Sequence, residues 1–147
     1  MQSRQSGAIH HLYFEIGDEV VASLTQYCQT RDIQNARISG IGALRDIELG
    51  IYQPETKSYR RKVFTETHEL LACQGNVTLK DGKPFPHIHV IIGNHDFNAF
   101  GGHLFNARVA VVGEFILEEL DSRVHREMDP KVGFPTWCLT EAGKEGS

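Results

Sequence analysis

The sequence predicts a single α+β domain in which one principal helix near the N-terminus accompanies a mainly antiparallel β-sheet. Short runs rich in β-branched and aromatic residues alternate with turn residues along most of the chain, which is typical of strands. One early segment instead has its apolar residues at helical spacing. With 147 residues, 40% of them hydrophobic and 23% charged, the chain has the size and composition of one soluble domain with its own core.

The domain is predicted to span residues 8–140. Residues 1–7 are polar and are expected to be flexible, as is the C-terminus at 141–147. The helix follows a first strand. Asp18 is its candidate N-cap, because a side-chain oxygen there can accept from the first free N–H groups. The helix is expected to end near residues 30–32.

Strands account for most of the remaining chain. They are expected at residues 8–16, 35–43, 46–52, 58–65, 69–79, 107–120 and 134–139, with two more strands around the histidines described below. The Ser-Gly-Ile-Gly-Ala run at residues 39–43 resembles a phosphate loop, but no Lys-Ser/Thr pair and no helix follow it. Close packing or a sharp bend is the better interpretation of these glycines. So many strands with one helix leave sheet surface to cover, which favours oligomerisation.

The stretch with the clearest chemical content is residues 84–104, because it holds three histidines at informative spacing. His87 and His89 lie two apart in a β-branched run, so on a strand both imidazoles face the same side. A turn-rich segment follows, and a second extended run leads to His103. If the two runs form a hairpin, the length of the loop decides which face His103 occupies.

A three-residue loop (94–96) or a five-residue loop (93–97) would place His103 directly opposite His87. An even-numbered loop would turn His103 to the other face, unless a bulge at Gly101-Gly102 restored the register. These glycines could also serve only to bend an edge strand, or to let a ligand or a neighbouring subunit approach the backbone.

Three imidazoles with one open position are typical of a Zn²⁺ site that keeps a water or an exogenous ligand. We therefore predict His87, His89 and His103 as ligands of a divalent transition metal, with Zn²⁺ first and Ni²⁺ or similar ions as alternatives. The competing interpretation is a set of surface or interface histidines without metal. No catalytic base is identified. The only candidates are carboxylates on predicted strands, namely Glu48, Glu69 and Glu114. His10 and His11 are adjacent on one predicted strand, so their side chains point to opposite faces and they do not form a ligand pair.

Charge and cysteine content bound the partners. The net charge of −4 argues against a strongly basic nucleic-acid surface, although Arg60, Arg61 and Lys62 form a local basic run. The three cysteines form no CxxC motif and imply no disulfide framework, and Cys28 is expected to be a buried packing residue of the helix. No apolar stretch is long enough to span a membrane, and no signal peptide is recognised, so a cytoplasmic protein is expected.

Several motifs in this order resemble the PPC (plants and prokaryotes conserved) domain in its stand-alone prokaryotic form. They are Ser-Gly-Ile-Gly-Ala-Leu at 39–44, Leu-Gly-Ile-Tyr at 49–52, Glu-Leu-Leu at 69–71 with Gly-Asn at 75–76, His-Ile-His at 87–89 and Gly-Gly-His-Leu at 101–104. The similarity extends over roughly residues 8–140. It implies an α/β fold around an antiparallel sheet, a homotrimer and a metal site at the same three histidines.

Members of this family are often labelled DNA-binding, but the AT-hook of the plant proteins has no counterpart here. Two hypotheses from different classes follow. In the first, the protein is a small trimeric metalloprotein whose open tri-histidine site binds, and could transform, a small molecule. In the second, it is a DNA-associated or protein-interaction regulatory module, with the histidines in a structural or bridging role. Whether it is an enzyme is left open by the sequence.

Overall fold

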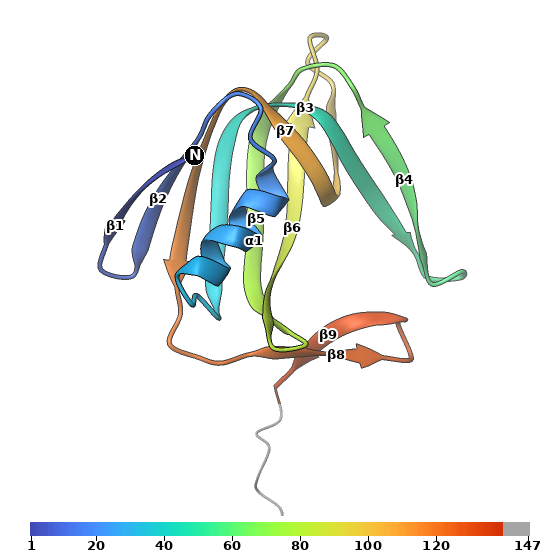
Figure 1. Cartoon of the computed structure of the whole chain (residues 1–147). Helices are drawn as coiled ribbons and strands as arrows, with labels where there is room; N and C mark the ends of the chain where they lie inside the picture. Colours follow the sequence, from blue (N-terminus) through green and yellow to red (C-terminus); the bar gives the residue numbers. More distant parts are fainter. Residues whose placement is uncertain (140–147) are drawn as a thin grey trace, which may run out of the picture.

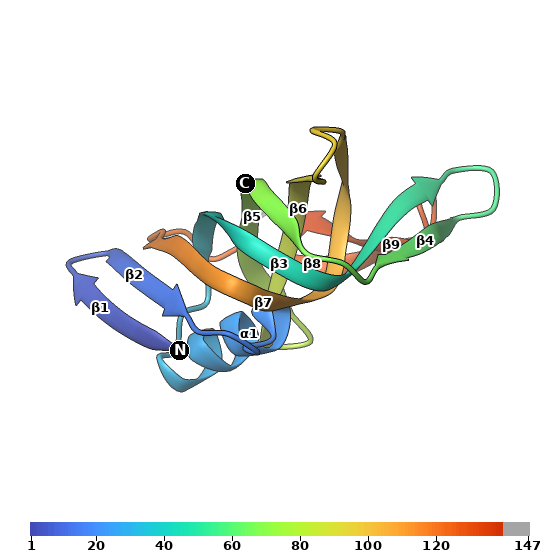
Figure 2. The same ribbon diagram turned by 90° about the horizontal axis from the view of Figure 1, so that it is seen from above.

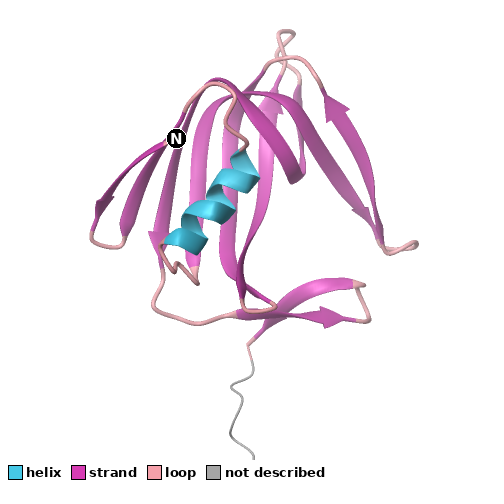
Figure 3. Cartoon of the chain, viewed as in Figure 1, coloured by secondary structure: helices cyan, strands magenta, loops and turns pink. Residues whose placement is uncertain are grey.

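The computed structural model describes residues 1–139 and consists of strands around a single helix (Figure 3). The elements in chain order are β1 Gln2–Ser6, β2 Ile9–Phe14, α1 Val20–Thr30, β3 Ala36–Gln53, β4 Ser58–Phe64, β5 His68–Lys80, β6 Lys83–Gly93, β7 Ala99–Glu119, β8 His125–Asp129 and β9 Phe134–Cys138. The predicted mainly β domain with one principal helix is confirmed for this part of the chain.

All nine strands belong to one sheet, and the pairing is antiparallel except between β5 and β8. Strands β3, β5, β6 and β7 pair in a closed ring, because β6 bonds to both β5 and β7 while β3 also bonds to both. Helix α1 lies against one face of this strongly curved sheet (Figures 1 and 2). The β8–β9 hairpin crosses one end of it (Figure 1).

The core lies between α1 and the sheet. Val20, Leu24, Tyr27 and Cys28 of the helix are buried, and they join the apolar side chains of the central strands in one cluster. Burial of these side chains supplies most of the driving force that holds a lone helix on a sheet. Cys28 is fully buried in this cluster, which confirms it as a packing residue. Burial also raises the pKa of its thiol to about 12.

The predicted N-cap is wrong. Glu19 occupies the N-cap position and its side chain makes no capping bond. The carboxylate of Asp18 instead accepts a hydrogen bond from the Glu15 N–H at 2.9 Å and lies 3.0 Å from the N-terminal ammonium of Met1. The Asp18 side chain therefore stabilises the turn before the helix and does not cap the helix.

The strands differ from prediction in four ways. The strands expected at 35–43 and 46–52 form one continuous strand, β3. The register of β3 with β7 shifts near Gly42 and Asp46, which both have positive φ. The strand of His103 likewise continues into the strand expected at 107–120 as β7. Residues 1–7, expected to be flexible, include β1, and β8 was not predicted at all. Residues 141–147 lie outside the described part.

Candidate metal centre

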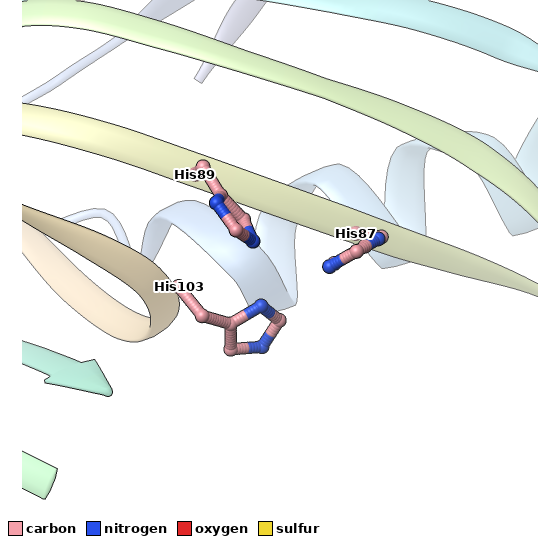
Figure 4. Close-up of side chains that lie close together, drawn as sticks. All are labelled: His87, His89 and His103. Carbon is pink, nitrogen blue, oxygen red and sulfur yellow. The ribbon is translucent and has the colours of Figure 1, made fainter. Parts of the chain in front are cut away.

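The three predicted histidines converge at one point of the sheet. His87 and His89 alternate along β6 with the buried Ile88 and Val90, so both imidazoles leave the core on the same side. His103 reaches them from the neighbouring strand β7, where it pairs with His89. The three rings point toward one another (Figure 4).

The register of the hairpin differs from the one expected. His103 lies opposite His89 and not opposite His87, because the strands leave the ladder at the Gly93–Ala99 pair and the loop covers residues 94–98. The Asn94 side chain holds this loop by accepting from the N–H groups of Asp96 and Asn98 at 3.0 and 2.9 Å. The loop is still odd-numbered, so all three histidines share a face as predicted.

The glycine pair does not form a bulge. Gly101 and Gly102 pair in regular register with Ile91 and Val90. A Cβ on Gly102 would come within 2.8 Å of the Gly50 carbonyl oxygen, and one on Gly101 within 3.0 Å of the Val90 carbonyl oxygen. Side chains at these positions would push β7 away from its neighbours. The glycines therefore serve close strand packing, which seats His103 near β6.

The geometry fits a metal ion. The ring centroids are 5.2 Å apart for His87 and His89, 5.1 Å for His87 and His103, and 5.6 Å for His89 and His103. One ring nitrogen of each lies within 4.8 Å of the other two. Nitrogens around tetrahedral Zn²⁺ are about 3.4 Å apart, so small side-chain rotations suffice. His103 Nδ1 is buried without a hydrogen-bond partner in residues 1–139. A buried nitrogen of this kind is usually satisfied, and a metal ion would satisfy it.

The electrostatics keep two of the rings neutral. Burial lowers the pKa of His87 to about 4, helped by the charges of Arg126 and His89. Burial is also the main cause that lowers the pKa of His103 to about 4, with the other two histidines, Arg61 and Arg126 adding to it. A neutral imidazole has a lone pair to give to a metal, so neither ring needs to lose a bound proton to solvent near neutral pH.

Arg126 of β8 is a residue that sequence reasoning missed. Its side chain is buried, at 8% exposure, and Nη2 lies 3.3 Å from His87 Nδ1 and 2.9 Å from Asn76 Oδ1. Nε donates to Thr78 Oγ1 and Nη1 to the Pro135 carbonyl oxygen. None of these partners is a carboxylate. A guanidinium only donates, so His87 Nδ1 accepts and Nε2 is left to face the other rings.

An aromatic wall bounds the site on the side of β4. His103 packs against Phe105 and Tyr59, with ring centroids 4.7 and 5.2 Å away. The Arg61 guanidinium lies over the Phe105 ring, 3.6 Å from its centroid, and forms an ion pair with Glu48 at 3.1 Å. Glu48 is thus a salt-bridged residue on the surface of the site. This wall restricts the approach of water to His103 from that direction.

The open side of the site is a groove of about 520 Å³ on the sheet. His87 and His89 line it together with Ser39, Gln74 and Asn76 on strands β3 and β5. Gln74 pairs with His89 across the ladder and Asn76 pairs with His87, so a row of amides runs beside the imidazoles. Amides and a hydroxyl can donate to a polar ligand or accept from it, so a small molecule could bind here beside the histidines.

The other histidines and the remaining carboxylate candidates do not join this site. His10 is buried and is held by the Tyr27 hydroxyl at 3.0 Å and by Glu119 at 2.6 Å, whereas His11 is exposed on the opposite face, as predicted. Glu114 lines a different groove. Asn76 could have been found from the sequence only if the pairing of β5 with β6 had been known. Nothing in the sequence pattern indicated Arg126.

The fold and the family were compared with known proteins. The family model described as the Plants and Prokaryotes Conserved (PCC) domain matches residues 1–121. The comparison with curated proteins found no match.

Several solved structures share the fold. One is a candidate DNA-binding protein from Bacteroides thetaiotaomicron, with 28% identity, a TM-score of 0.90 and coverage of 93% of this chain and 96% of that one. A plant- and prokaryote-conserved (PPC) protein from Pyrococcus horikoshii has 31% identity and a TM-score of 0.84, covering 92% and 94%. A metal-containing protein from Archaeoglobus fulgidus has 36% identity and a TM-score of 0.83, covering 91% and 95%.

No helix among the described residues is long and apolar enough to cross a membrane. The family model extends over most of the chain, and two solved relatives with at least 31% identity match nearly all of it. The predicted resemblance to this family is confirmed, with the family model matching residues 1–121. The chain belongs to the Plants and Prokaryotes Conserved domain family.

Proposed function

We propose that this protein is a small metal-binding protein whose His87, His89 and His103 hold a divalent transition metal, with Zn²⁺ as the first candidate. The convergence of the three imidazoles carries the proposal. The buried Nδ1 of His103, which has no partner in residues 1–139, supports it. So does the description of the Archaeoglobus fulgidus relative as metal-containing. Zn²⁺ bound by three histidines can lower the pKa of a bound water toward 7.

The ligand of the open position is proposed to be a small molecule that enters through the groove beside His87 and His89. The amides of Gln74 and Asn76 would orient it by hydrogen bonds. Arg126 adds a positive charge behind His87 that no carboxylate within 4.0 Å balances in residues 1–139, and this favours an anionic ligand. Among residues 1–139, the groove beside His87 and His89 is lined by no carboxylate that could act as a general base, so the proposal is limited to binding.

The decisive experiment is the metal content per chain of native, untagged protein, measured by elemental mass spectrometry. The intact protein is expected to carry a transition metal, and His87→Ala and His103→Ala are each expected to lower the metal content per chain. His95→Ala is the matched control, because His95 is exposed in the loop between β6 and β7. Metal content that is the same in all four proteins would refute the assignment of the ligands.

We also propose that the chain assembles as a homotrimer through the sheet face that α1 leaves open. A groove of about 850 Å³ on the sheet is lined by Ile41, Leu71 and Ile116, which are 55%, 54% and 43% exposed. Clustered exposed apolar side chains of this kind mark interaction surfaces. Leu71→Glu is expected to reduce the mass in light scattering to that of a single chain, whereas Val63→Glu on β4, at a similarly exposed residue, should leave it unchanged.

A second candidate function is that of a DNA-associated or protein-interaction regulatory module. It is favoured by the description of the Bacteroides thetaiotaomicron relative and by the basic run Arg60, Arg61 and Lys62 on β4. The net charge of −4 opposes it. Retarded migration of duplex DNA at physiological salt, lost in Arg60→Ala/Lys62→Ala, would support this function, and no retention at low salt would exclude its DNA-binding form.

A cytoplasmic location is proposed for either function. None of the three cysteines forms a disulfide, and disulfides are rare in the reducing cytoplasm.

A further inference from the structure

A second group of metal-ligand side chains lies on the β8–β9 hairpin. His125 and Glu127 are two apart on β8, so they face the same side, and Cys138 of β9 pairs directly with His125. One ligand atom from each of the three lies within 4.8 Å of the other two. His125 Nε2 is 3.1 Å from Glu127 Oε1. The register of a two-stranded ladder thus brings together an imidazole, a carboxylate and a thiol.

This group is separate from the tri-histidine site. Arg126 lies between His125 and Glu127 in the chain, and its side chain turns the other way, into the buried contacts with Thr78 and Asn76. One face of the hairpin therefore directs the Arg126 side chain toward β5, while the opposite face carries the three candidate ligands. The side chains of His125 and Glu127 are 46% and 68% exposed, so an ion from solution can reach them.

The set of donors is selective. Imidazole nitrogen, thiolate sulfur and carboxylate oxygen are the three ligand types of protein zinc sites. A thiolate disfavours Mg²⁺ and Ca²⁺, which prefer oxygen, and favours Zn²⁺ and similar borderline ions. Three protein ligands leave a fourth position for water. The competing interpretation is a simple His125–Glu127 hydrogen bond with no ion.

We propose that His125, Glu127 and Cys138 form a second, thiolate-containing site for Zn²⁺ or a similar ion. The hairpin is tied to the sheet by two ladder pairs, Leu79 with His125 and Lys80 with Arg126, and by the Arg126 side chain. Tyr52 and Lys57 also donate hydrogen bonds to carbonyl oxygens of its turn. An ion that links β8 to β9 at this point would fasten the hairpin and so hold Arg126 against His87. The second site would then influence the first one by fixing the position of the Arg126 charge.

The test is a titration of the metal-free full chain with Co²⁺, followed by absorption. A thiolate ligand produces a charge-transfer band in the near ultraviolet that histidine ligands alone do not produce. The band is expected in the wild-type protein, absent in Cys138→Ser, and shifted to at least ~10-fold higher Co²⁺ concentration in His125→Ala and Glu127→Gln. It should persist in His87→Ala, so failure of the tri-histidine site and failure of this one are distinguishable.

A second measurement does not depend on variants that could fold poorly. Cys28 and Cys73 are buried, and burial raises the pKa of each thiol to about 12, whereas Cys138 is only partly buried. Cys138 should therefore react first with an alkylating reagent, and Zn²⁺ alone should slow that reaction at least ~10-fold. No near-ultraviolet band in the wild type, a band unchanged in both His125→Ala and Glu127→Gln, or alkylation unaffected by Zn²⁺ would overturn the proposal.

Discussion

Arg126 places a buried positive charge behind a proposed metal ligand, and its removal should strengthen metal binding. Arg126 Nη2 is 3.3 Å from His87 Nδ1. Adding the width of the imidazole and a metal–nitrogen bond puts the guanidinium about 7–8 Å from an ion bound at Nε2. At an effective dielectric constant of about 40–80, a unit charge at that distance opposes a divalent ion by ~1–2 kcal/mol. This corresponds to an about tenfold change in the dissociation constant.

The hydrogen bond acts in the same direction. When His87 holds a metal through Nε2, its Nδ1 carries the ring proton and can no longer accept from Arg126. Metal ligands usually donate this proton to an acceptor, which Arg126 cannot provide. Arg126→Gln removes the charge and offers an amide oxygen, Arg126→Met removes only the charge, and Arg126→Lys retains the charge.

The assay is competition for Zn²⁺ with a chromophoric chelator, in a Cys138→Ser background so that the hairpin site does not contribute. Arg126→Gln and Arg126→Met are expected to bind about tenfold more tightly, and Arg126→Lys to bind like the parent protein. Both neutral variants should also lose ~1–3 kcal/mol of stability, because Thr78 and Asn76 lose their donor. Weaker Zn²⁺ binding by folded neutral variants would refute the electrostatic reasoning and show that Arg126 acts by orienting His87.

Three further outcomes are expected. In protein freed of metal by a chelator, the free energy of unfolding should fall as the pH drops from 6.5 toward 4. The reason is that the pKa values of His87 and His103 are lowered to about 4 in the folded state, so the unfolded chain binds protons first and the stability from these two residues is fully present only above pH 6.5. Urea unfolding across this range measures the effect, and a His87→Gln/His103→Gln variant should show a flatter profile. Gly42→Ala should lower the free energy of unfolding by ~3 kcal/mol or more, because its Cβ would lie 2.2 Å from the Val112 carbonyl oxygen. Gly7→Ala, also at positive φ but in open space, should lower it by only ~1 kcal/mol. Equal losses in urea unfolding would contradict this account. Gly102→Ala should lower metal affinity as well as stability, because a Cβ 2.8 Å from the Gly50 carbonyl oxygen moves β7 and with it His103, and metal content together with urea unfolding measures both effects.

Local pattern predicted much of the fold. The alternation of apolar and polar residues placed most of the strands, and the helical spacing of apolar residues placed α1, because both periods are direct consequences of backbone geometry. The same period of two placed His87 and His89 on one face. Boundaries were less accurate, since β3 and β7 continue through the bends at which the sequence suggested separate strands.

Spacing alone left the face of His103 open, because an odd-numbered and an even-numbered loop were both possible. The five-residue loop of the structure places His103 on the predicted face. The sequence also did not select the strand partner, because the loop lies at 94–98, one residue further along the chain than the predicted five-residue loop. There the Asn94 side chain accepts from the N–H groups of Asp96 and Asn98, which no periodicity reveals. The resulting register sets His103 against His89. The candidate ligands could therefore be named from the sequence, whereas their mutual geometry depended on how the loop closes.

The chain by itself determined an antiparallel sheet with one helix and three histidines able to share a face, because these follow from patterns within a few residues of one another. Only the tertiary structure brought Arg126 to His87, 39 residues away in the chain, and Cys138 to His125 across a hairpin that was not predicted. Contacts of this kind depend on how strands far apart in sequence are ordered in the sheet. That order is decided by burial of the whole core, which no local pattern contains.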